Sequence, residues 1–174
     1  MVLNLRSVAA FLALGASTAN AADISSGDWN WNIDGTDMFY AGTSNNAQNL
    51  LAQFCYLTDG NCVYAVSFGL NCDKGEKYPA LLNSDSGARS IELICGNKMQ
   101  GQNVLMFSSF EEIDGIIRSN NRIGFVLPLK GDEFKAIRFS LRGSAKALDA
   151  MRTAVQIMTD AARSEDVKPA AETL

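Results

Sequence analysis

Residues 54–62 read FCYLTDGNC, and this short stretch decides how the chain is expected to fold. Cys55 and Cys62 flank Asp59 and Gly60, two residue types that favour tight turns. Such an arrangement could be a metal-binding knuckle, a redox pair or a disulfide across a hairpin. The choice between these three determines which classes of function remain open to the protein.

The segments on either side of this turn are typical of β-strands. Residues 52–56 and 62–68 are rich in aromatic and β-branched side chains. If residues 56–61 form a six-residue loop, the two cysteines lie directly opposite each other, close enough for a disulfide. A two-residue turn at Asp59-Gly60 would instead make them diagonal neighbours, which is a poorer geometry.

The chain has four cysteines, and the other two are Cys72 and Cys95. The spacing lacks the C-x-x-C pairs that zinc sites and thioredoxin-like redox motifs use. An even number of cysteines in an exported chain indicates a disulfide framework. Three pairings are possible, and we predict Cys55–Cys62 and Cys72–Cys95, because the second pair would join the ends of two strands.

The first 22 residues have the features of a secretory signal peptide. Arg6 precedes a short apolar run, residues 7–15, and a small-residue segment ends at Ala21 and Ala22. The run is too short to cross a bilayer, so we predict cleavage after Ala21 or Ala22. The remaining chain has no apolar stretch long enough for a membrane span. We therefore expect a periplasmic or secreted protein with no stable membrane insertion.

The rest of the chain reads as one β-rich domain over residues 23–163. Trp29, Trp31 and Ile33 alternate with polar residues, as on a half-buried strand. Similar patterns predict strands throughout the domain, and loops over residues 71–87 and 96–103. The strands are expected at residues 28–33, 38–43, 49–56, 62–68, 90–95, 104–107, 123–129 and 135–142.

Two helices complete the prediction. Ser109 and Glu112 form a capping-box pattern before a short helix that ends at residues 119–121. A longer helix opens at residues 143–144 and carries an apolar stripe expected to pack on the sheet. This stripe contains Leu148, Met151, Val155 and Met158, flanked by Ala147, Ala154 and Ala161. Residues 164–174 are predicted to be a disordered tail. The fold class is thus α+β, mainly β, with sandwich-like antiparallel sheets.

The second half of the domain also resembles a known family. A Pro-led loop after Tyr78, the alternating strand at residues 91–95, a strand and a short helix precede the block FSLRGSAKALDAM at residues 139–151. This strand–Gly–helix block resembles the invasion-associated locus B family of exported bacterial proteins. The resemblance implies a periplasmic, β-rich, non-enzymatic protein linked to the cell envelope or to host interaction. It implies no active-site residue.

Composition argues in the same direction. The 174 residues include no histidine, which removes the commonest general base and metal ligand. The net charge of −4 gives no basic footprint for nucleic acid. Glu111 and Glu112 suit a helix N-terminus, and Asn32, Asp34 and Asp37 lack the pattern of a calcium loop.

We therefore expect no enzymatic activity, no metal or other cofactor, and an unidentified protein partner. The leading interpretation is an envelope-associated or host-interaction accessory protein. The alternative is a periplasmic inhibitor or immunity protein that blocks a hydrolase or toxin.

Overall fold

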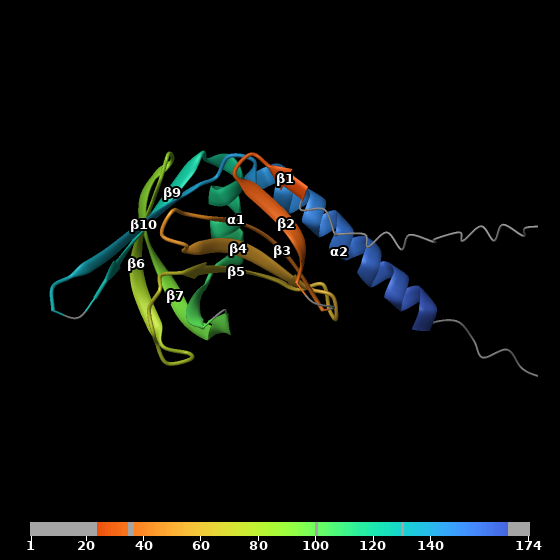
Figure 1. The fold of residues 1–174 in the computed structure, drawn as a ribbon, viewed down its shortest axis with the longest axis horizontal. Coiled ribbons are helices and arrows are strands. Elements are labelled where there is room, and N and C mark those ends of the chain that lie inside the picture. Colours follow the sequence, from red (N-terminus) through yellow and green to blue (C-terminus); the bar gives the residue numbers. More distant parts are fainter. Residues whose placement is uncertain (1–23, 35–36, 100, 130, 167–174) are drawn as a thin grey trace, which may run out of the picture.

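The predicted strands join into a single antiparallel sheet, flanked by two helices (Figure 1). The computed structural model describes residues 24–34, 37–99, 101–129 and 131–166. These contain strands β1 Ile24–Ser26, β2 Trp29–Asp34, β3 Met38–Ser44, β4 Leu50–Tyr56, β5 Cys62–Ser67, β6 Lys77–Ser84, β7 Gly87–Met99, β8 Gln102–Phe107, β9 Arg122–Pro128 and β10 Phe134–Ser140, and helices α1 Phe110–Ser119 and α2 Ser144–Asp166. The α+β, mainly β, fold class is confirmed. The predicted signal peptide lies outside the described residues.

The strand order is β1-β2-β3-β4-β5-β8-β7-β6-β9-β10. The sheet curls so that its first strands approach its last, and backbone groups join across the gap. The Asp28 N–H donates to the Arg142 carbonyl at 2.9 Å, and the Trp29 indole N–H donates to the Ser140 carbonyl at 2.9 Å. We call this contact between residues 26–29 and residues 140–143 the seam. Trp29 is fully buried there, whereas Ile33, further along the same face, is 43% exposed.

Two glycines allow the seam to close. Gly143 has φ +87°, and a Cβ on it would lie 1.8 Å from the Ser26 carbonyl oxygen. Gly27 has φ +60°, and its Cβ would lie 2.5 Å from the Arg142 carbonyl oxygen. Because both positions combine a left-handed backbone with a direct backbone contact, any side chain would force the two segments apart. The glycine of the strand–Gly–helix block therefore has a packing role.

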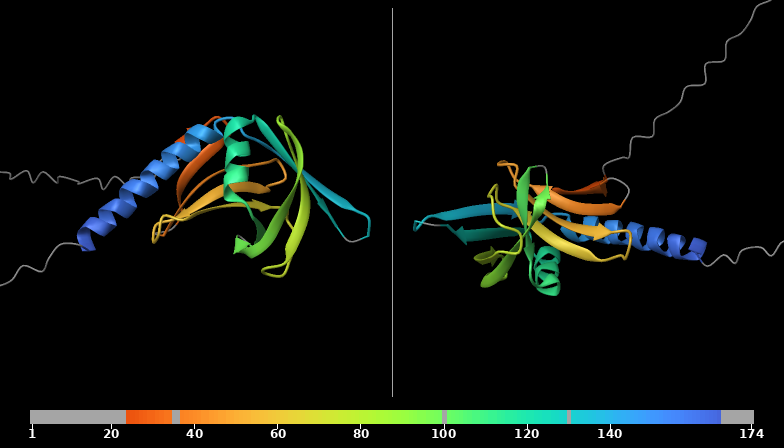
Figure 2. Two further views of the ribbon diagram at one scale, coloured as in Figure 1. Left: turned by 180° about the vertical axis from the view of Figure 1, so that it is seen from behind. Right: turned by 90° about the horizontal axis from the view of Figure 1, so that it is seen from below.

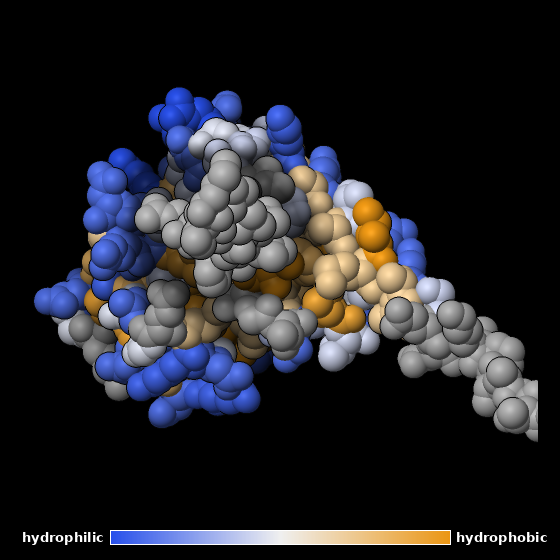
Figure 3. Space-filling model, turned by 45° about the vertical axis from the view of Figure 1, so that its right-hand side comes forward, coloured by the Kyte–Doolittle hydropathy of each residue, from blue (hydrophilic) through white to orange (hydrophobic). Residues whose placement is uncertain are grey.

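Helix α2 starts at the seam and packs only its first half on the sheet (Figure 2). Leu148, Met151 and Val155 are buried in the core, as the stripe predicted. Met158 is 45% exposed, because the buried face of the helix continues from Val155 to Thr159 and leaves Met158 to one side. Figure 3 shows apolar side chains gathered over this second half of α2. The helix ends at Asp166, so the predicted tail was wrong for residues 164–166.

The largest error concerns β6, which lies inside the predicted loop at residues 71–87. Pro79 suggested a loop, since proline cannot donate to a ladder. However, β9 pairs only with Leu81–Ser84 of β6, so Pro79 faces no partner on that side. The predicted loop at residues 96–103 was also wrong, because β7 runs to Met99 with a bulge between Cys95 and Lys98. Strand β1 was not predicted.

The short helix α1 is present, but its predicted capping box does not form. Ser109 occupies the N-cap position with no side-chain cap hydrogen bond. Glu112 instead pairs with Arg89 at 3.2 Å. Ile113, Ile116 and Ile117 are buried against the sheet, so tertiary packing holds the helix.

Candidate binding site

Both predicted disulfides are present. Cys55 and Cys62 are directly opposite in the β4–β5 ladder, with their Cα atoms 4.0 Å apart. Cys72 and Cys95 are joined across 23 positions of sequence, with a Cα separation of 6.1 Å. The pairing and the direct opposition of Cys55 and Cys62 are confirmed, although β4 includes Tyr56 and the loop is residues 57–61, and no cysteine among the described residues is free. The two disulfides lie in different surroundings: Cys72 lines a cavity of about 900 Å³, and Cys62 lines a smaller one of about 330 Å³ beneath α2.

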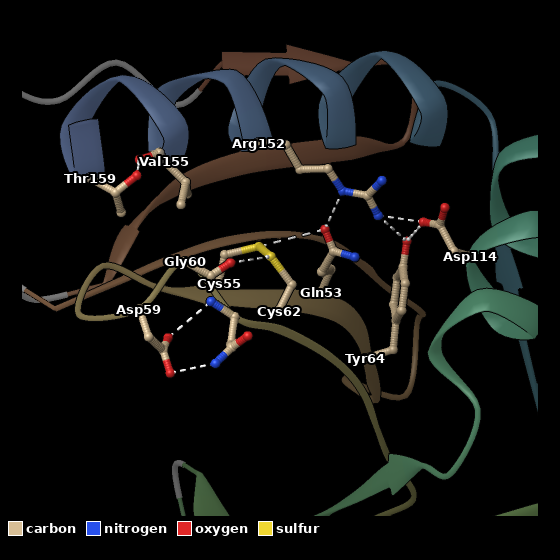
Figure 4. Close-up of a disulfide and its surroundings, with 11 residues drawn as sticks. Gln53, Cys55, Asp59, Gly60, Cys62, Tyr64, Asp114, Arg152, Val155 and Thr159 are labelled. Carbon is tan, nitrogen blue, oxygen red and sulfur yellow. Dashed lines mark hydrogen bonds and ion pairs between the residues drawn. A yellow bond between two sulfur atoms is a disulfide. The ribbon is translucent and has the colours of Figure 1, made fainter.

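The hairpin disulfide lies beneath α2, beside a buried polar network (Figure 4). Arg152 of α2 donates to the Gln53 side-chain oxygen at 2.8 Å and forms an ion pair with Asp114 of α1. The Tyr64 hydroxyl donates to Asp114 at 2.7 Å. Arg152 also lies over the Phe110 ring, 5.6 Å from its centroid. One arginine thus connects both helices to the centre of the sheet.

This network is structural in character. Burial, followed by the hydrogen bond to Asp114, raises the pKa of Tyr64 far above its ordinary value, so its hydroxyl remains a donor. Gln53 is fully buried, and its Nε2 has no hydrogen-bond partner. Because the polar groups of Tyr64, Asp114 and Arg152 bond to one another, the network positions the two helices on the sheet.

The principal concave feature is a cavity of about 900 Å³ bordered by the second disulfide, which we call the recess. Its floor is formed by Phe68, Leu105 and Leu127, all buried core side chains. The loop after β5 and the end of β9 supply further apolar walls. The remaining lining residues are Leu70, Asn71, Cys72, Asp73, Glu76, Tyr78, Lys98, Asn103, Pro128 and Leu129.

The loop that forms one wall of the recess is held firmly. Besides the disulfide, the Gly75 N–H donates to the Cys95 carbonyl at 2.8 Å, and the Cys95 N–H donates to the Glu76 carbonyl at 2.8 Å. The buried Asn103 side chain accepts from the Cys72 N–H at 3.3 Å and donates to the Gly96 carbonyl at 3.3 Å. The wall is therefore preformed.

Charged groups occupy the rim of the recess. Glu76 accepts hydrogen bonds from the Tyr78 hydroxyl and, at 3.4 Å, from the Asp73 N–H. The hydrogen bond to Glu76 raises the pKa of Tyr78 to about 12, so the phenol stays protonated. Lys98, at the end of the bulge in β7, also lines the recess. The recess thus combines an apolar floor with charges of both signs.

The sequence located Cys72 and Cys95 but missed the other residues of the recess. Tyr78 was missed because β6 was taken for a loop, although Tyr78, Ala80 and Leu82 alternate as a strand pattern. Lys98 and Asn103 were missed because their positions depend on the bulge. Asn32 and Asp37 lie away from the recess, and no group of three metal-ligating side chains occurs among the described residues. None of the described helices is long and apolar enough to span a membrane.

Comparison with known proteins identifies a fold neighbour. No protein-family model matches the chain, and no curated protein matches it in sequence. Among solved structures, invasion associated protein B from Bartonella henselae is similar, with a TM-score of 0.58 over 79% of this chain and 99% of that chain. The sequence identity is 16%, so the likeness shows a shared fold. The fold expected from the invasion-associated resemblance is therefore observed.

Proposed function

We propose that the protein is an exported, non-enzymatic protein-binding module of the bacterial envelope, or of the host interface, and that it binds its partner at the recess. The support for export is the signal-peptide pattern of residues 1–22 together with two disulfides. The support for the envelope or host role is the fold shared with a protein named as invasion-associated. The support for binding without catalysis is the residue inventory, which has no histidine.

The preformed recess is the observation that carries the proposal. Its apolar floor can receive one or two apolar side chains, and its mixed rim can orient them. The disulfide and the hydrogen bonds of Asn103 fix the wall before binding, which lowers the ordering cost of association. A partner that presents an apolar side chain beside charged groups fits this arrangement.

The test is affinity capture from periplasmic extract with three proteins. Wild type is compared with Leu70→Asp, which adds a charge to the recess wall, and with Leu81→Asp as the matched control. Leu81 is 47% exposed on β6 and does not line the recess. We expect a protein that is retained by wild type and Leu81→Asp and lost with Leu70→Asp.

The identity of the captured protein separates two roles. Envelope components support the accessory role, whereas a murein hydrolase or toxin that loses activity on binding supports the inhibitor role. Equal capture by both leucine variants would show that the recess is not the binding surface. Catalytic turnover of any substrate by the purified protein would refute the non-enzymatic assignment.

A further inference from the structure

The sheet has a second apolar face that no described helix covers. Ala52, Phe54, Ala65 and Val104 are buried together in a cluster separate from the main core. The buried apolar residues of α1 and α2 all belong to the main core cluster, which lies on the other face of the sheet. An antiparallel sheet with helices on one side usually has a polar opposite face. Strands β3, β4, β5 and β8 depart from this rule.

A groove of about 550 Å³ runs over this face, and we call it the outer groove. Its apolar lining consists of Tyr40, Leu50, Phe54, Met99 and Val104. Tyr40 and Phe54 pack with ring centroids 6.2 Å apart. Ser44, Gln48, Ser67 and Gln102 complete the lining, and none of the lining residues is charged, so the apolar part of the groove can hold an apolar chain.

Small residues lie beneath the side chains that line the outer groove. Gly42 pairs with Ala52 across β3 and β4, and a Cβ on Gly42 would lie 2.5 Å from the Ala52 Cβ. Ala65 lies opposite Ala52 on β5, and both alanines are buried below the lining residues.

One end of the outer groove is polar and lies near a cation. Ser67 and Gln102 line this end. A Cβ on Gly69 would lie 3.8 Å from the Gln102 side-chain oxygen and 3.6 Å from the Lys135 ammonium nitrogen, so both side chains approach Gly69, although Lys135 itself does not line the groove. Lys135 is half-buried, and none of the ion pairs found in the described part of the chain includes it. An anionic group bound at this end of the groove could form an ion pair with Lys135.

Size distinguishes a small ligand from a protein partner. Four strands about 4.8 Å apart and about 20 Å long present a face of roughly 400 Å². A stable protein interface needs about 800 Å² from each partner. A volume of 550 Å³, by contrast, is within the range of small-molecule sites, which is roughly 300–1,000 Å³.

We infer that the outer groove binds a single-chain carboxylate amphiphile, such as a free fatty acid. Its hydrocarbon chain lies along Tyr40, Phe54 and Met99, and its carboxylate pairs with Lys135 beside Gln102. This site is separate from the recess and does not depend on the function proposed there.

The test uses displacement of the neutral fluorescent probe N-phenyl-1-naphthylamine from the full mature protein. Dodecanoate and dodecanol are compared below the concentrations at which they aggregate. We expect both to displace the probe from wild type. Lys135→Gln should weaken the binding of dodecanoate by about fivefold, which is the effect of losing one partly buried ion pair. The same change should leave the binding of dodecanol unaltered. Met99→Glu should abolish binding of both.

Matched controls keep the inference falsifiable. Lys98→Gln removes an exposed lysine of the recess, and Leu70→Asp alters the recess wall, so both should bind dodecanoate as wild type does. Circular dichroism shows whether Met99→Glu is folded. Absence of probe and dodecanoate binding to wild type would overturn the site. An equal response of both ligands to Lys135→Gln would overturn the head-group assignment. If the wild-type protein dimerises and Met99→Glu abolishes the dimer, the occupant of the outer groove is a second copy of the chain and not an amphiphile.

Discussion

The seam and the recess join distant segments of the chain in opposite ways. At the seam, two backbones meet at Gly27 and Gly143 with no room for a side chain. At the recess, a disulfide and Asn103 hold a loop away from the core floor and leave about 900 Å³ open. Contact at the seam contributes stability, whereas separation at the recess leaves open the surface at which we propose that a partner binds.

This difference teaches where substitutions should affect folding and where they should affect binding. A seam variant should lower the free energy of unfolding without any specific effect on the recess. A recess variant should alter partner capture even when its cost in stability is modest. The following changes test that division, from the largest expected effect to the smallest.

Gly143→Ala should have the largest effect on stability. The added Cβ would overlap the Ser26 carbonyl, so we expect a loss of about 4 kcal/mol or failure to fold. Gly75→Ala is the control, because Gly75 also has a positive φ, +89°, but nothing within 4 Å of its Cβ position. It should cost about 1 kcal/mol. Urea unfolding measures both, and equal losses would remove the argument for contact at the seam.

Removal of Cys72–Cys95 by alanine at both positions should cost about 3 kcal/mol, because the bond closes a sequence separation of 23. Removal of Cys55–Cys62, which closes a separation of 7, should cost somewhat less, about 2.5 kcal/mol. Thermal or urea unfolding gives both values. Partner capture should be lost only with the first pair, and loss with the hairpin pair alone would contradict the placement of the binding surface.

Asn103→Ala should cost about 1–3 kcal/mol, since it leaves the Cys72 N–H and the Gly96 carbonyl without a partner. Asn97→Ala, at an exposed position nearby, is the control and should be close to neutral. Hydrogen exchange should show faster exchange of the Cys72 amide only in the first variant. Unchanged exchange there would show that Asn103 does not hold the wall of the recess.

Asp28 should give the smallest effect, visible as a pH dependence. Hydrogen bonds from Ser140 and then Arg142 hold the pKa of the Asp28 carboxyl below its ordinary value of 3.8. Folding therefore favours the ionised form, whose contribution is present above pH 3.8 and is lost as the pH falls through the lower, folded value. In urea midpoints, wild type should exceed Asp28→Asn above pH 4, and the gap should shrink below it. If the difference between the two urea midpoints grows in acid, the ionised form of Asp28 does not stabilise the fold.

The sequence was sufficient for features that depend on neighbouring residues. The hairpin at Cys55–Cys62, the alternation of β2 and β10, and the stripe of α2 up to Val155 follow from local patterns, and the structure has them. It was insufficient for β6, because the tolerance of Pro79 depends on how far β9 extends along β6. It also placed Met158 in the core, because the apolar pattern could not indicate that the polar residue Thr159 continues the buried face after Val155.

By itself, then, the sequence determined the strand-rich fold class and the two disulfides, because turn chemistry, alternation and cysteine spacing act over a few residues. Only the tertiary structure decided that Gly143 must be a glycine, that Arg152 joins both helices to the sheet, and that Tyr78, Lys98 and Asn103 border one recess. These features arise where a curled ten-stranded sheet brings segments far apart in the chain into contact. Local preferences do not specify such contacts, because they depend on the register and curvature of every strand between them.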